Sequence, residues 1–330
     1  MTTHRHKTLG LTDEEVIEMY KTMLLARKLD ERMWLLNRAG KIPFVISCQG
    51  QEGAQVGASF ALNRNADYVA PYYRDMGVVL AFGMTPRELM LSGFAKAEDP
   101  NSGGRQMPGH FGQKKNRILT GSSPVTTQLP HAVGVALAAK MENENVVSFV
   151  TLGEGSSNQG DFHEGLNFAG VHQLPVITMV ENNKYAISVP LERQLACEYV
   201  SERAQGYGMP GITVNGNDPL DVYEAVKTAR ERAVNGDGPT LIEAITDRLT
   251  AHSSDDDDRA YREPEEIEEA KKKDTLILFA NYLHQCGVLT DDSEQAIKDE
   301  VDAIVNDATD YAENAPYAEP ESALKYVYEE

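Results

Sequence analysis

The chain has 330 residues, of which 41% are hydrophobic and 25% charged, and this composition excludes extensive disorder. Its formal net charge is −20, which disfavours contact with nucleic-acid phosphates or with an anionic membrane surface. Most of this charge, −16, lies in residues 255–330, so the first 254 residues are nearly neutral and can accept an anionic ligand.

The cysteines and the N-terminus exclude several further classes of protein. Cys48, Cys197 and Cys286 are far apart and form no Cys-x-x-Cys pair, which excludes a disulfide framework and a cysteine-rich zinc site. The first ten residues lack an apolar signal core, and no apolar run reaches the length of a membrane span. We therefore expect a cytoplasmic protein that binds neither nucleic acid nor membrane.

The N-terminal part of the chain predicts one long helix. About ten residues that we expect to be mobile come first. Thr12 and Glu15 then have the spacing of a capping box, which marks the start of a helix. Apolar residues recur with helical spacing from there to about Asn37, so the helix is expected to end near that residue.

The next part predicts loops around two shorter helices. Residues 40–73 mix glycine, aromatic and small residues, and they predict a loop-rich stretch. Helices are expected near residues 86–95 and 127–141. Between them, residues 98–116 are crowded with Gly, Pro, Asn and Lys. A loop of that length inside a compact chain is usually functional or disordered.

The pattern changes at residue 146. Residues 146–152 form an unbroken apolar run of strand length, 161–172 have a helical pattern, and 175–180 form a second buried strand. This order predicts a right-handed βαβ unit in a parallel sheet. Later elements continue the alternation, with a strand at 211–216, a helix at 220–234 and a strand at 240–249.

These elements predict an α/β fold with a mostly parallel sheet flanked by helices and with helical extensions at both ends. We divide the chain into an N-terminal helical arm at 1–40, an α/β domain at 41–255 and an acidic helical C-terminal region at 256–330. No internal repeat is present in the sequence.

Two loops at the ends of adjacent strands carry the strongest functional signal. Glu154 directly follows the first apolar strand and Asn183 follows the next, so parallel pairing places them side by side. A carboxylate and an amide oxygen suit Mg²⁺, which completes its coordination with phosphate oxygens and water. Gly153 and Gly155 allow the backbone to approach a diphosphate at the start of the following helix.

Two other phosphate motifs do not match this segment. A dinucleotide fingerprint requires glycine where Asn158 stands, and the sequence contains no Walker Gly-Lys-Ser/Thr. A glycine-rich turn with incidental acidic residues is the remaining alternative for the first loop taken by itself. The second loop, 29 residues further on, distinguishes the pair from such a turn.

The pair of loops resembles the thiamin diphosphate motif Gly-Asp-Gly…Asn-Asn, with Glu154 in place of the commoner Asp, as in 2-oxo acid dehydrogenase alpha subunits. The resemblance extends over nearly the whole chain, except for the first dozen residues and the C-terminal tail. The alpha subunit of branched-chain 2-oxo acid dehydrogenase is similar in these segments: GKIPF, GQEG, YYRD, GRQMPGHFG, SSPVTTQLPHAVG, GEGSSNQGDFHEGLNFA, ENNKYAIS and RLTAHSSDDDDRAYR.

The resemblance implies a set of site residues and a thiamin diphosphate-binding fold. The Mg²⁺ ligands would be Glu154, Asn183 and the carbonyl of Tyr185. Contacts to thiamin diphosphate would come from Tyr73, Arg74, Ser123, Gly155, Ser156 and His252. A potassium site that steadies the cofactor loop in some members would use Ser122, Pro124, Thr127 and Gln128. Phe44 and Val125 match positions that line the acyl pocket.

His252 is the catalytic candidate, because histidine exchanges protons near neutral pH. Taken alone, the residue favours a solvated histidine beside an acidic run, and His110 has the same ambiguity. Residues 255–258 are four aspartates that repel one another, so we expect a solvated loop that becomes ordered with cofactor. Ser253 matches a serine that kinases modify in mammalian relatives. Glu181 departs from branched-chain members that place an arginine on the diphosphate there.

The resemblance implies oxidative decarboxylation of branched-chain 2-oxo acids such as 3-methyl-2-oxobutanoate, with acyl transfer to the lipoyl group of a dihydrolipoyl acyltransferase. The pyrimidine-activating glutamate of the family belongs to a beta subunit, so we expect a heterotetramer of two alpha and two beta chains. Glu181 favours an alternative, the alpha subunit of pyruvate or acetoin dehydrogenase. A non-catalytic acidic scaffold that binds a basic partner is the alternative from another class.

Overall fold

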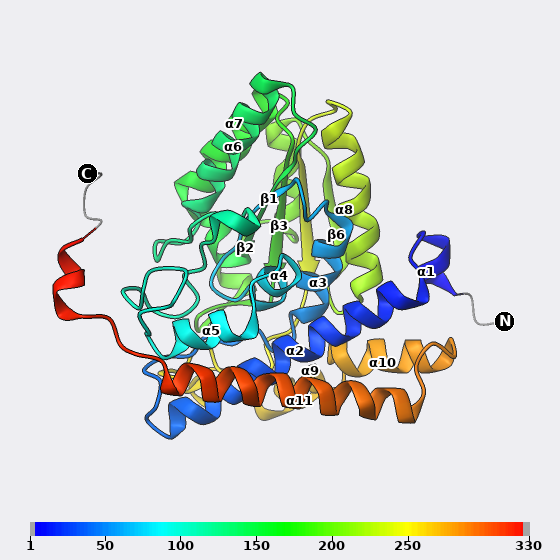
Figure 1. Ribbon diagram of the computed structural model, residues 1–330. Helices are drawn as coiled ribbons and strands as arrows, with labels where there is room; N and C mark the ends of the chain where they lie inside the picture. Colours follow the sequence, from blue (N-terminus) through cyan, green and yellow to red (C-terminus); the bar gives the residue numbers. More distant parts are fainter. Residues whose placement is uncertain (1–3, 326–330) are drawn as a thin grey trace.

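The computed structural model describes residues 4–325, and a five-stranded parallel sheet forms its centre (Figure 1). The strand order is β1-β2-β3-β7-β6, and each neighbouring pair is parallel. The strands are β1 (Tyr68–Ala70), β2 (Ser148–Gly153), β3 (Val176–Asn182), β6 (Gly211–Asn215) and β7 (Thr240–Ile245). A separate antiparallel pair consists of β4 (Tyr185–Ala186) and β5 (Val189–Pro190). The α/β fold with a mostly parallel sheet is confirmed.

The central strands are apolar along their length because helices cover both faces of the sheet. Every residue of β3 is buried, whereas the residues of the edge strand β6 are exposed or half-buried. On one face, α6 (Gln128–Glu142) and α7 (Gly160–Val171) pack over Val150 and Leu152. On the other face, Phe149 and Ile177 belong to a core shared with α3 (Glu52–Ala61), α4 (Met76–Ala81) and α8 (Pro219–Val234).

A layer of helices crosses the lower end of the molecule in Figure 1. It consists of α2 (Asp13–Arg38), α5 (Pro86–Gly93), α9 (Pro264–Lys271), α10 (Thr275–Gln285) and α11 (Asp291–Asn314), and the short α1 (Arg5–Thr8) lies at one end. The capping box that begins α2 is confirmed: the Thr12 hydroxyl accepts from the Glu15 N–H, and the Glu15 carboxylate accepts from the Thr12 N–H. The 3₁₀ turns are Lys114–Asn116, Glu154–Asn158, Leu191–Arg193, Val200–Tyr207, Asp258–Ala260 and Pro320–Leu324.

The loop-rich interpretation of residues 40–73 is wrong, because α3 occupies 52–61 and β1 occupies 68–70. Helix α3 has small residues on all sides, and these residues let it lie close to its neighbours. A Cβ on Gly57 would come within 2.4 Å of the Pro219 carbonyl oxygen. With eight of its ten residues buried, α3 lacks the one-sided apolar pattern by which a surface helix is recognised.

A buried ion cluster joins α3 to two distant helices. Arg27 on α2 donates to Glu52 at 2.6 Å and to Asp274, the N-cap of α10, at 2.8 Å. All three side chains are at most 11% exposed. Removing one member of such a cluster typically costs about 3–5 kcal/mol, because a buried charge loses its partner.

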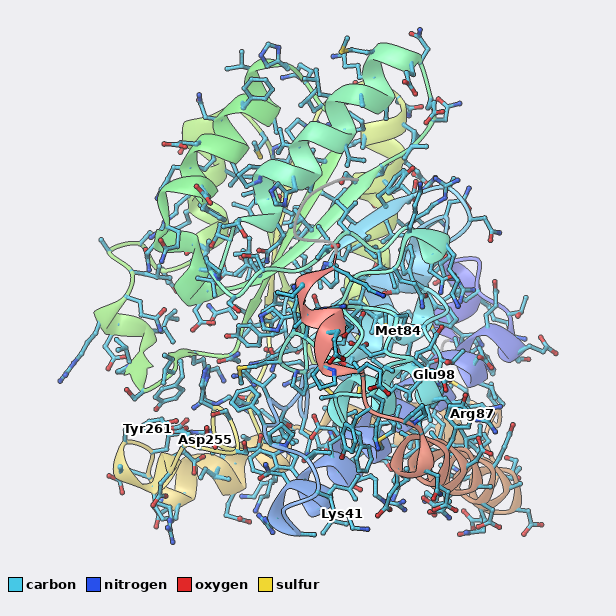
Figure 2. All side chains as sticks on the ribbon, turned by 60° about the vertical axis from the view of Figure 1, so that its left-hand side comes forward. Lys41, Met84, Arg87, Glu98, Asp255 and Tyr261 are labelled. Carbon is cyan, nitrogen blue, oxygen red and sulfur yellow. The ribbon has the colours of Figure 1, made fainter. Side chains whose placement is uncertain are left out.

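The N-terminal and C-terminal helices share one hydrophobic core with a face of the sheet. Arg87 on α5 pairs with Asp307 on α11 at 2.7 Å, and Figure 2 labels Arg87 beside this helix. The domain boundaries at 40/41 and 255/256 stay predictions, and residues 326–330 lie outside the described part of the chain. The expectation of about ten mobile N-terminal residues is wrong for residues 4–10, since α1 forms there and His6 is fully buried; residues 1–3 lie outside the described part. Within residues 4–325, no helix combines the length and apolar character needed to cross a bilayer.

Candidate functional site

A cavity of about 370 Å³ lies where β2 and β3 end. The structure brings ten of the predicted site residues to its wall: Tyr73, Arg74, Ser123, Val125, Glu154, Gly155, Ser156, Asn183, Tyr185 and His252. Gly153, which the sequence also placed beside the diphosphate, lies in the wall, and three further wall residues were not predicted: Tyr72, Ala186 and Ile187. The register of the sheet explains the placement, because Gly153 pairs with Glu181 and the two following loops leave the sheet together.

Glu154 is a buried carboxylate whose hydrogen-bond donors are uncharged. Its Oε2 accepts from the backbone N–H of Asn183 and its Oε1 from Gln194 Nε2, each at the long distance of 3.3 Å. The residue is 1% exposed, and burial raises the pKa of its carboxyl group. The charge of Arg74 favours the ionised form of this carboxylate, but its effect on the pKa is smaller than that of burial. The donor set at the cavity floor therefore suits a small cation.

The amide of Asn183 is oriented by neighbouring residues. Its Nδ2 donates to Gln51 Oε1 at 3.4 Å, and its Oδ1 accepts from the Tyr185 N–H at 3.3 Å. Gln51 Oε1 also accepts from the Tyr72 hydroxyl at 3.0 Å. Gln51 is fully buried, so it fixes which side of the Asn183 amide carries the oxygen. Sequence spacing gave no sign of this contact, because Gln51 and Asn183 are 132 residues apart.

Gly155 is required by packing as well as by its place beside the cavity. A Cβ on this residue would lie 2.5 Å from the Ala186 Cβ, too close for any side chain without displacement of the backbone. The antiparallel pair β4–β5 therefore lies directly against the turn Glu154–Asn158. Tyr185, which opens β4, lies in the same wall as Glu154.

Arg74 and His252 lie side by side in the cavity wall, and Arg74 supplies its positive charge. Arg74 is 2% exposed, so its guanidinium lies inside the protein rather than on the surface. It donates to the Ser47 carbonyl at 2.7 Å, and its Nη2 lies 2.9 Å from His252 Nδ1. Because a guanidinium can only donate, His252 Nδ1 is an acceptor and Nε2 carries the proton. Burial, followed by the charges of Arg74 and Arg248, lowers the pKa of His252 to about 4, so the ring is neutral at neutral pH.

In the loop of four aspartates, Asp256 makes hydrogen bonds within the protein, whereas the residues on either side of it face solvent. Asp256 accepts from the His252 N–H at 2.8 Å and from the Tyr261 hydroxyl, whereas Asp255 and Asp257 are exposed. Tyr261 in turn accepts from Arg248 Nη2 at 2.8 Å, and Figure 2 labels Asp255 and Tyr261 at this edge of the molecule. The expectation that all four aspartates are solvated is therefore wrong for Asp256.

Ser253, next to His252, is buried, and His110 contacts a residue of the cavity wall. Ser253 is 6% exposed, so it is reached from solvent only when this loop opens. His110 Nε2 lies 2.6 Å from the Ser123 hydroxyl, and Ser123 is in the cavity wall. His110 therefore contacts a wall residue and is not itself part of the wall.

Arg248 also fixes a strained residue at the cavity. Ile187 has a φ of 57°, a left-handed conformation that is unfavourable for a β-branched side chain. Both terminal nitrogens of Arg248 donate to the Ile187 carbonyl at 3.1 Å. The Ile187 side chain is 57% exposed and lines the cavity. The hydrogen bonds from Arg248 thus hold the strained Ile187, and its apolar side chain, in the cavity wall with Tyr185 and Ala186.

Glu181 is buried behind the wall and is not a wall residue of the cavity. Its Oε2 accepts from Gln55 Nε2 at 3.1 Å and from the Tyr72 hydroxyl at 3.2 Å, and its carboxyl group is hydrogen-bonded to Asp75. Burial and the neighbouring Asp75 raise the pKa of Glu181 well above its usual range, so the two carboxyl groups share a proton. The Glu181 side chain therefore makes a hydrogen bond with Tyr72, while Arg74 is the charged side chain that lines the cavity beside Tyr72.

The predicted acyl-pocket residues are separated. Val125 lines the main cavity, whereas Phe44 lines a small neighbouring cavity, and Tyr73 belongs to both walls. The predicted potassium ligands lie in the turn that leads into α6. There Thr127 donates to the Pro124 carbonyl at 3.1 Å and Gln128 Nε2 donates to the Thr151 carbonyl at 3.0 Å. Ser122 is half-buried in the same turn.

Comparison with known proteins gives one consistent result. The family model described as the dehydrogenase E1 component matches residues 20–321. The chain is 74% identical over 328 residues to 2-oxoisovalerate dehydrogenase subunit alpha of Bacillus subtilis (strain 168), which covers 99% of both chains. It is 39% identical over 322 residues to the mitochondrial 2-oxoisovalerate dehydrogenase subunit alpha of Mus musculus, with 97% of this chain and 72% of the relative covered. It is 37% identical over 321 residues to a pyruvate dehydrogenase E1 component subunit alpha of Staphylococcus aureus (strain Mu50 / ATCC 700699), with 97% and 84% covered.

Proposed function

Because the chain belongs to the dehydrogenase E1 component family, we propose that it is the alpha subunit of a branched-chain 2-oxo acid dehydrogenase, a thiamin diphosphate-dependent oxidoreductase. The observation that carries the substrate class is the end-to-end similarity to a 2-oxoisovalerate dehydrogenase alpha subunit, which is about twice as high in identity as that to the pyruvate enzyme. The reaction is the oxidative decarboxylation of 2-oxo acids such as 3-methyl-2-oxobutanoate, with the acyl group passed to a lipoyl acceptor.

The residues of the cavity fit the diphosphate half of the cofactor. Thiamin diphosphate supplies a carbon nucleophile and an electron sink for decarboxylation. We assign Mg²⁺ to Glu154, Asn183 and the Tyr185 carbonyl, since the buried Glu154 carboxylate needs a cation beside it. Arg74 adds positive charge on the opposite side, and the other predicted cofactor contacts, Tyr73, Ser123, Gly155, Ser156 and His252, surround the same space. The turn at Ser122, Pro124, Thr127 and Gln128 remains the proposed potassium site.

His252 is proposed to donate a hydrogen bond to the reacting group through Nε2. Arg74 occupies Nδ1 and fixes the tautomer, while Asp256 holds the backbone N–H of the same residue. The low pKa makes the neutral ring the resting form, so Nε2 keeps its proton and stabilises negative charge that develops on the reacting group.

The acyl chain is proposed to lie between Val125 and Ile187, which are the branched aliphatic side chains of the cavity wall. Phe44 lines the small neighbouring cavity, which shares Tyr73 with the main one. One methylene in an apolar pocket is worth about 1–3 kcal/mol, which corresponds to roughly 10–200-fold in discrimination between substrates. Glu181 lines no part of the cavity, so we propose that it makes no direct contact that favours one 2-oxo acid over another.

We expect the purified chain alone to have no sustained decarboxylase activity, and its mixture with the beta subunit to be active. The pyrimidine-activating glutamate of the family belongs to the beta chain, so we propose an assembly of two alpha and two beta chains. The measurement is decarboxylation of 3-methyl-2-oxobutanoate and of pyruvate by the alpha chain, by the beta chain and by the pair. Turnover by the alpha chain alone contradicts the need for a partner, and a preference of the pair for pyruvate contradicts the substrate assignment.

Gln51→Leu is expected to weaken Mg²⁺ binding by roughly 10–100-fold, the usual cost of removing a residue that orients a metal ligand. The physical reason is that the Asn183 amide loses the contact that fixes its oxygen. The measurement is titration of Mg²⁺ into the assembled enzyme with thiamin diphosphate present, followed by calorimetry. Tyr72→Phe is the matched control, because it removes a bond to Gln51 and keeps the bond from Asn183. Equal Mg²⁺ affinity in the Gln51 variant and the wild type refutes this role.

A further inference from the structure

Three side chains of types that bind metals, two histidines and one cysteine, come together at the end of the helical layer where α1 lies. The cysteine is far from the two histidines in sequence. His4 and His6 lie at the start of the chain, and Cys286 directly follows α10. One potential ligand atom from each lies within 4.8 Å of the other two. None of the three belongs to the wall of the large cavity. We propose that His4, His6 and Cys286 form a binding site for a transition-metal dication, with Zn²⁺ as the best match to two imidazoles and one thiolate.

His6 is already oriented as a metal-binding histidine. It is fully buried, its Nε2 lies 2.8 Å from Asp13 Oδ1, and its Nδ1 lies 2.7 Å from the Tyr282 hydroxyl. The carboxylate accepts, so Nε2 carries the proton and Nδ1 presents its lone pair. A carboxylate on the second ring nitrogen is the usual support of a histidine that binds zinc. Lys7 holds Asp13 in turn, with Nζ 2.8 Å from Oδ2.

The lone pair of His6 faces the side where Cys286 lies. The Tyr282 hydroxyl contacts both His6 Nδ1 and the Cys286 side chain, so these two groups approach the same point. Binding of the metal replaces the hydrogen bond from Tyr282 to Nδ1 with a bond to the metal. The Cys286 thiol releases its proton to solvent and forms a sulfur–metal bond, while His4 supplies the third bond. The fourth position of a tetrahedral ion remains for water or the Tyr282 oxygen.

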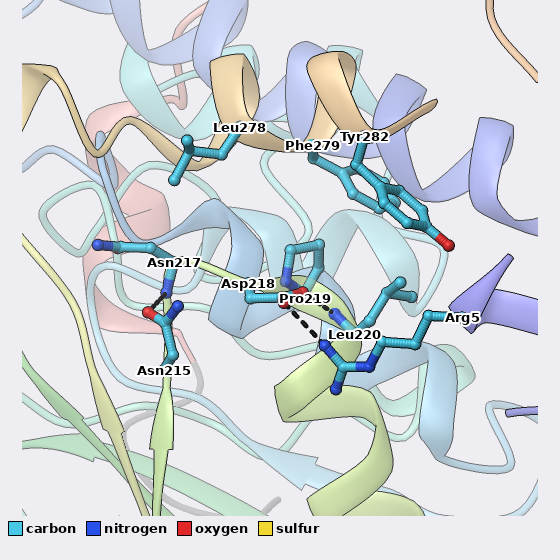
Figure 3. Close-up of a pocket in the computed structure, with 9 residues that line it drawn as sticks. All are labelled: Arg5, Asn215, Asn217, Asp218, Pro219, Leu220, Leu278, Phe279 and Tyr282. Carbon is cyan, nitrogen blue, oxygen red and sulfur yellow. Dashed lines mark hydrogen bonds and ion pairs between the residues drawn. The ribbon is translucent and has the colours of Figure 1, made fainter. Parts of the chain in front are cut away.

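The segment that carries both histidines is held in place by other contacts, so the ligands are preorganised. Arg5 Nη1 pairs with Asp218 at 2.9 Å, an interaction drawn in Figure 3. The backbone N–H of His6 donates to the Tyr282 hydroxyl at 3.0 Å. Figure 3 also shows Tyr282 projecting from α10 toward this segment, next to Phe279. A bound ion would therefore link the N-terminal segment to the end of α10.

The test uses the metal-free full chain in excess Mg²⁺, so that oxygen-ligand sites are filled, with Co²⁺ as the spectroscopic probe. We expect a thiolate-to-cobalt charge-transfer band that saturates at one equivalent of Co²⁺ per chain and disappears when Zn²⁺ displaces Co²⁺. Cys286→Ser should lose the band. His4→Ala should weaken Co²⁺ binding at least tenfold, and this exposed residue can be replaced without opening the core. Cys197→Ser is the matched control and should keep the full band, because Cys197 is a partly exposed free cysteine outside the cluster.

A second measurement follows stability. Zn²⁺ should raise the unfolding temperature of the wild type and of Cys197→Ser, and should leave that of Cys286→Ser unchanged, since only a native-state site stabilises by mass action. Asp13→Asn should lower Co²⁺ affinity by about 10–100-fold, with Glu14→Gln as the control on the neighbouring exposed residue. Absence of a thiolate band, a band that persists in Cys286→Ser, or a band lost in Cys197→Ser would each overturn the proposal.

Discussion

Glu154→Ala is expected to abolish Mg²⁺-dependent binding of thiamin diphosphate while the protein remains folded. The substitution removes the one carboxylate of the proposed metal site. The loss of Mg²⁺ affinity should therefore exceed the roughly 10–100-fold caused by replacing a residue that only orients a metal ligand. The fold should persist because Glu154 is buried with uncharged donors only 3.3 Å away, and its charge is a cost to stability rather than a gain. Calorimetric titration of cofactor into the assembled enzyme, with and without Mg²⁺, measures the effect.

The matched control for this substitution is Glu164→Ala, which removes an exposed carboxylate from α7. Its cofactor affinity and its unfolding temperature should equal those of the wild type. Circular dichroism and the unfolding temperature of Glu154→Ala separate loss of the site from loss of the fold. Unchanged cofactor affinity in a well-folded Glu154→Ala enzyme would show that the metal is held elsewhere.

His252→Ala is expected to lower transfer of the acyl group to a lipoyl acceptor by about 10²–10³-fold, the usual cost of removing one hydrogen-bond donor that stabilises developing negative charge. Cofactor affinity should fall only modestly, because Arg74 keeps its bond to the Ser47 carbonyl and its place in the cavity wall. The two readouts are the rate of lipoyl acylation and the cofactor dissociation constant, measured on the same preparation.

The pH dependence of the wild type adds a check on this role. Since the pKa of His252 is lowered to about 4, its neutral form persists as pH falls through the ordinary range of histidine, and acyl transfer should not decline there on account of this residue. His172→Ala, at an exposed position after α7, is the control. Near-normal acylation by His252→Ala would show that the Nε2 hydrogen bond does not contribute to acyl transfer.

Arg259 offers a way to follow the loop that carries His252. It is exposed and pairs with Asp257, so trypsin can reach it. Binding of cofactor beside His252 and Arg74 should slow cleavage there, because Asp256 ties the loop to the His252 backbone. Equal cleavage rates with and without cofactor and Mg²⁺ would show that the loop does not respond to the site.

The sequence was sufficient for the parts of the fold that follow a strong local pattern. The apolar runs of β2, β3 and β7 and the capping box at Thr12 are local signals, and each element formed where it was expected. Because parallel strands end on the same edge, the two loops after β2 and β3 also placed Glu154 and Asn183 together. The parallel order of β2 and β3 therefore predicted that Glu154 and Asn183 lie close together, although they are 29 residues apart in sequence.

The rest depends on contacts between remote segments. Helix α3 has no polar face because Arg27, Asp274 and Pro219 surround it, and none of these is near it in sequence. The roles of Gln51 and Tyr72 depend on the same kind of contact. The prediction that all four aspartates are solvated was wrong for another reason. It rested on the net charge of the run as a whole, whereas Asp256 faces the protein and Asp255 faces solvent.

The ion cluster of Arg27, Glu52 and Asp274 sets the order in which this chain can mature on the ribosome. Arg27 and Glu52 emerge early, but Asp274 follows only after most of the chain has been synthesised. The apolar face of α2 also waits for α11, which is translated last and shares its core. A nascent or prematurely terminated product that lacks Asp274 therefore has an Arg27 side chain without two of its hydrogen-bond acceptors, and a helix α2 without its contact to α11. The acidic C-terminal region thus supplies contacts that the N-terminal helix can make only late in synthesis.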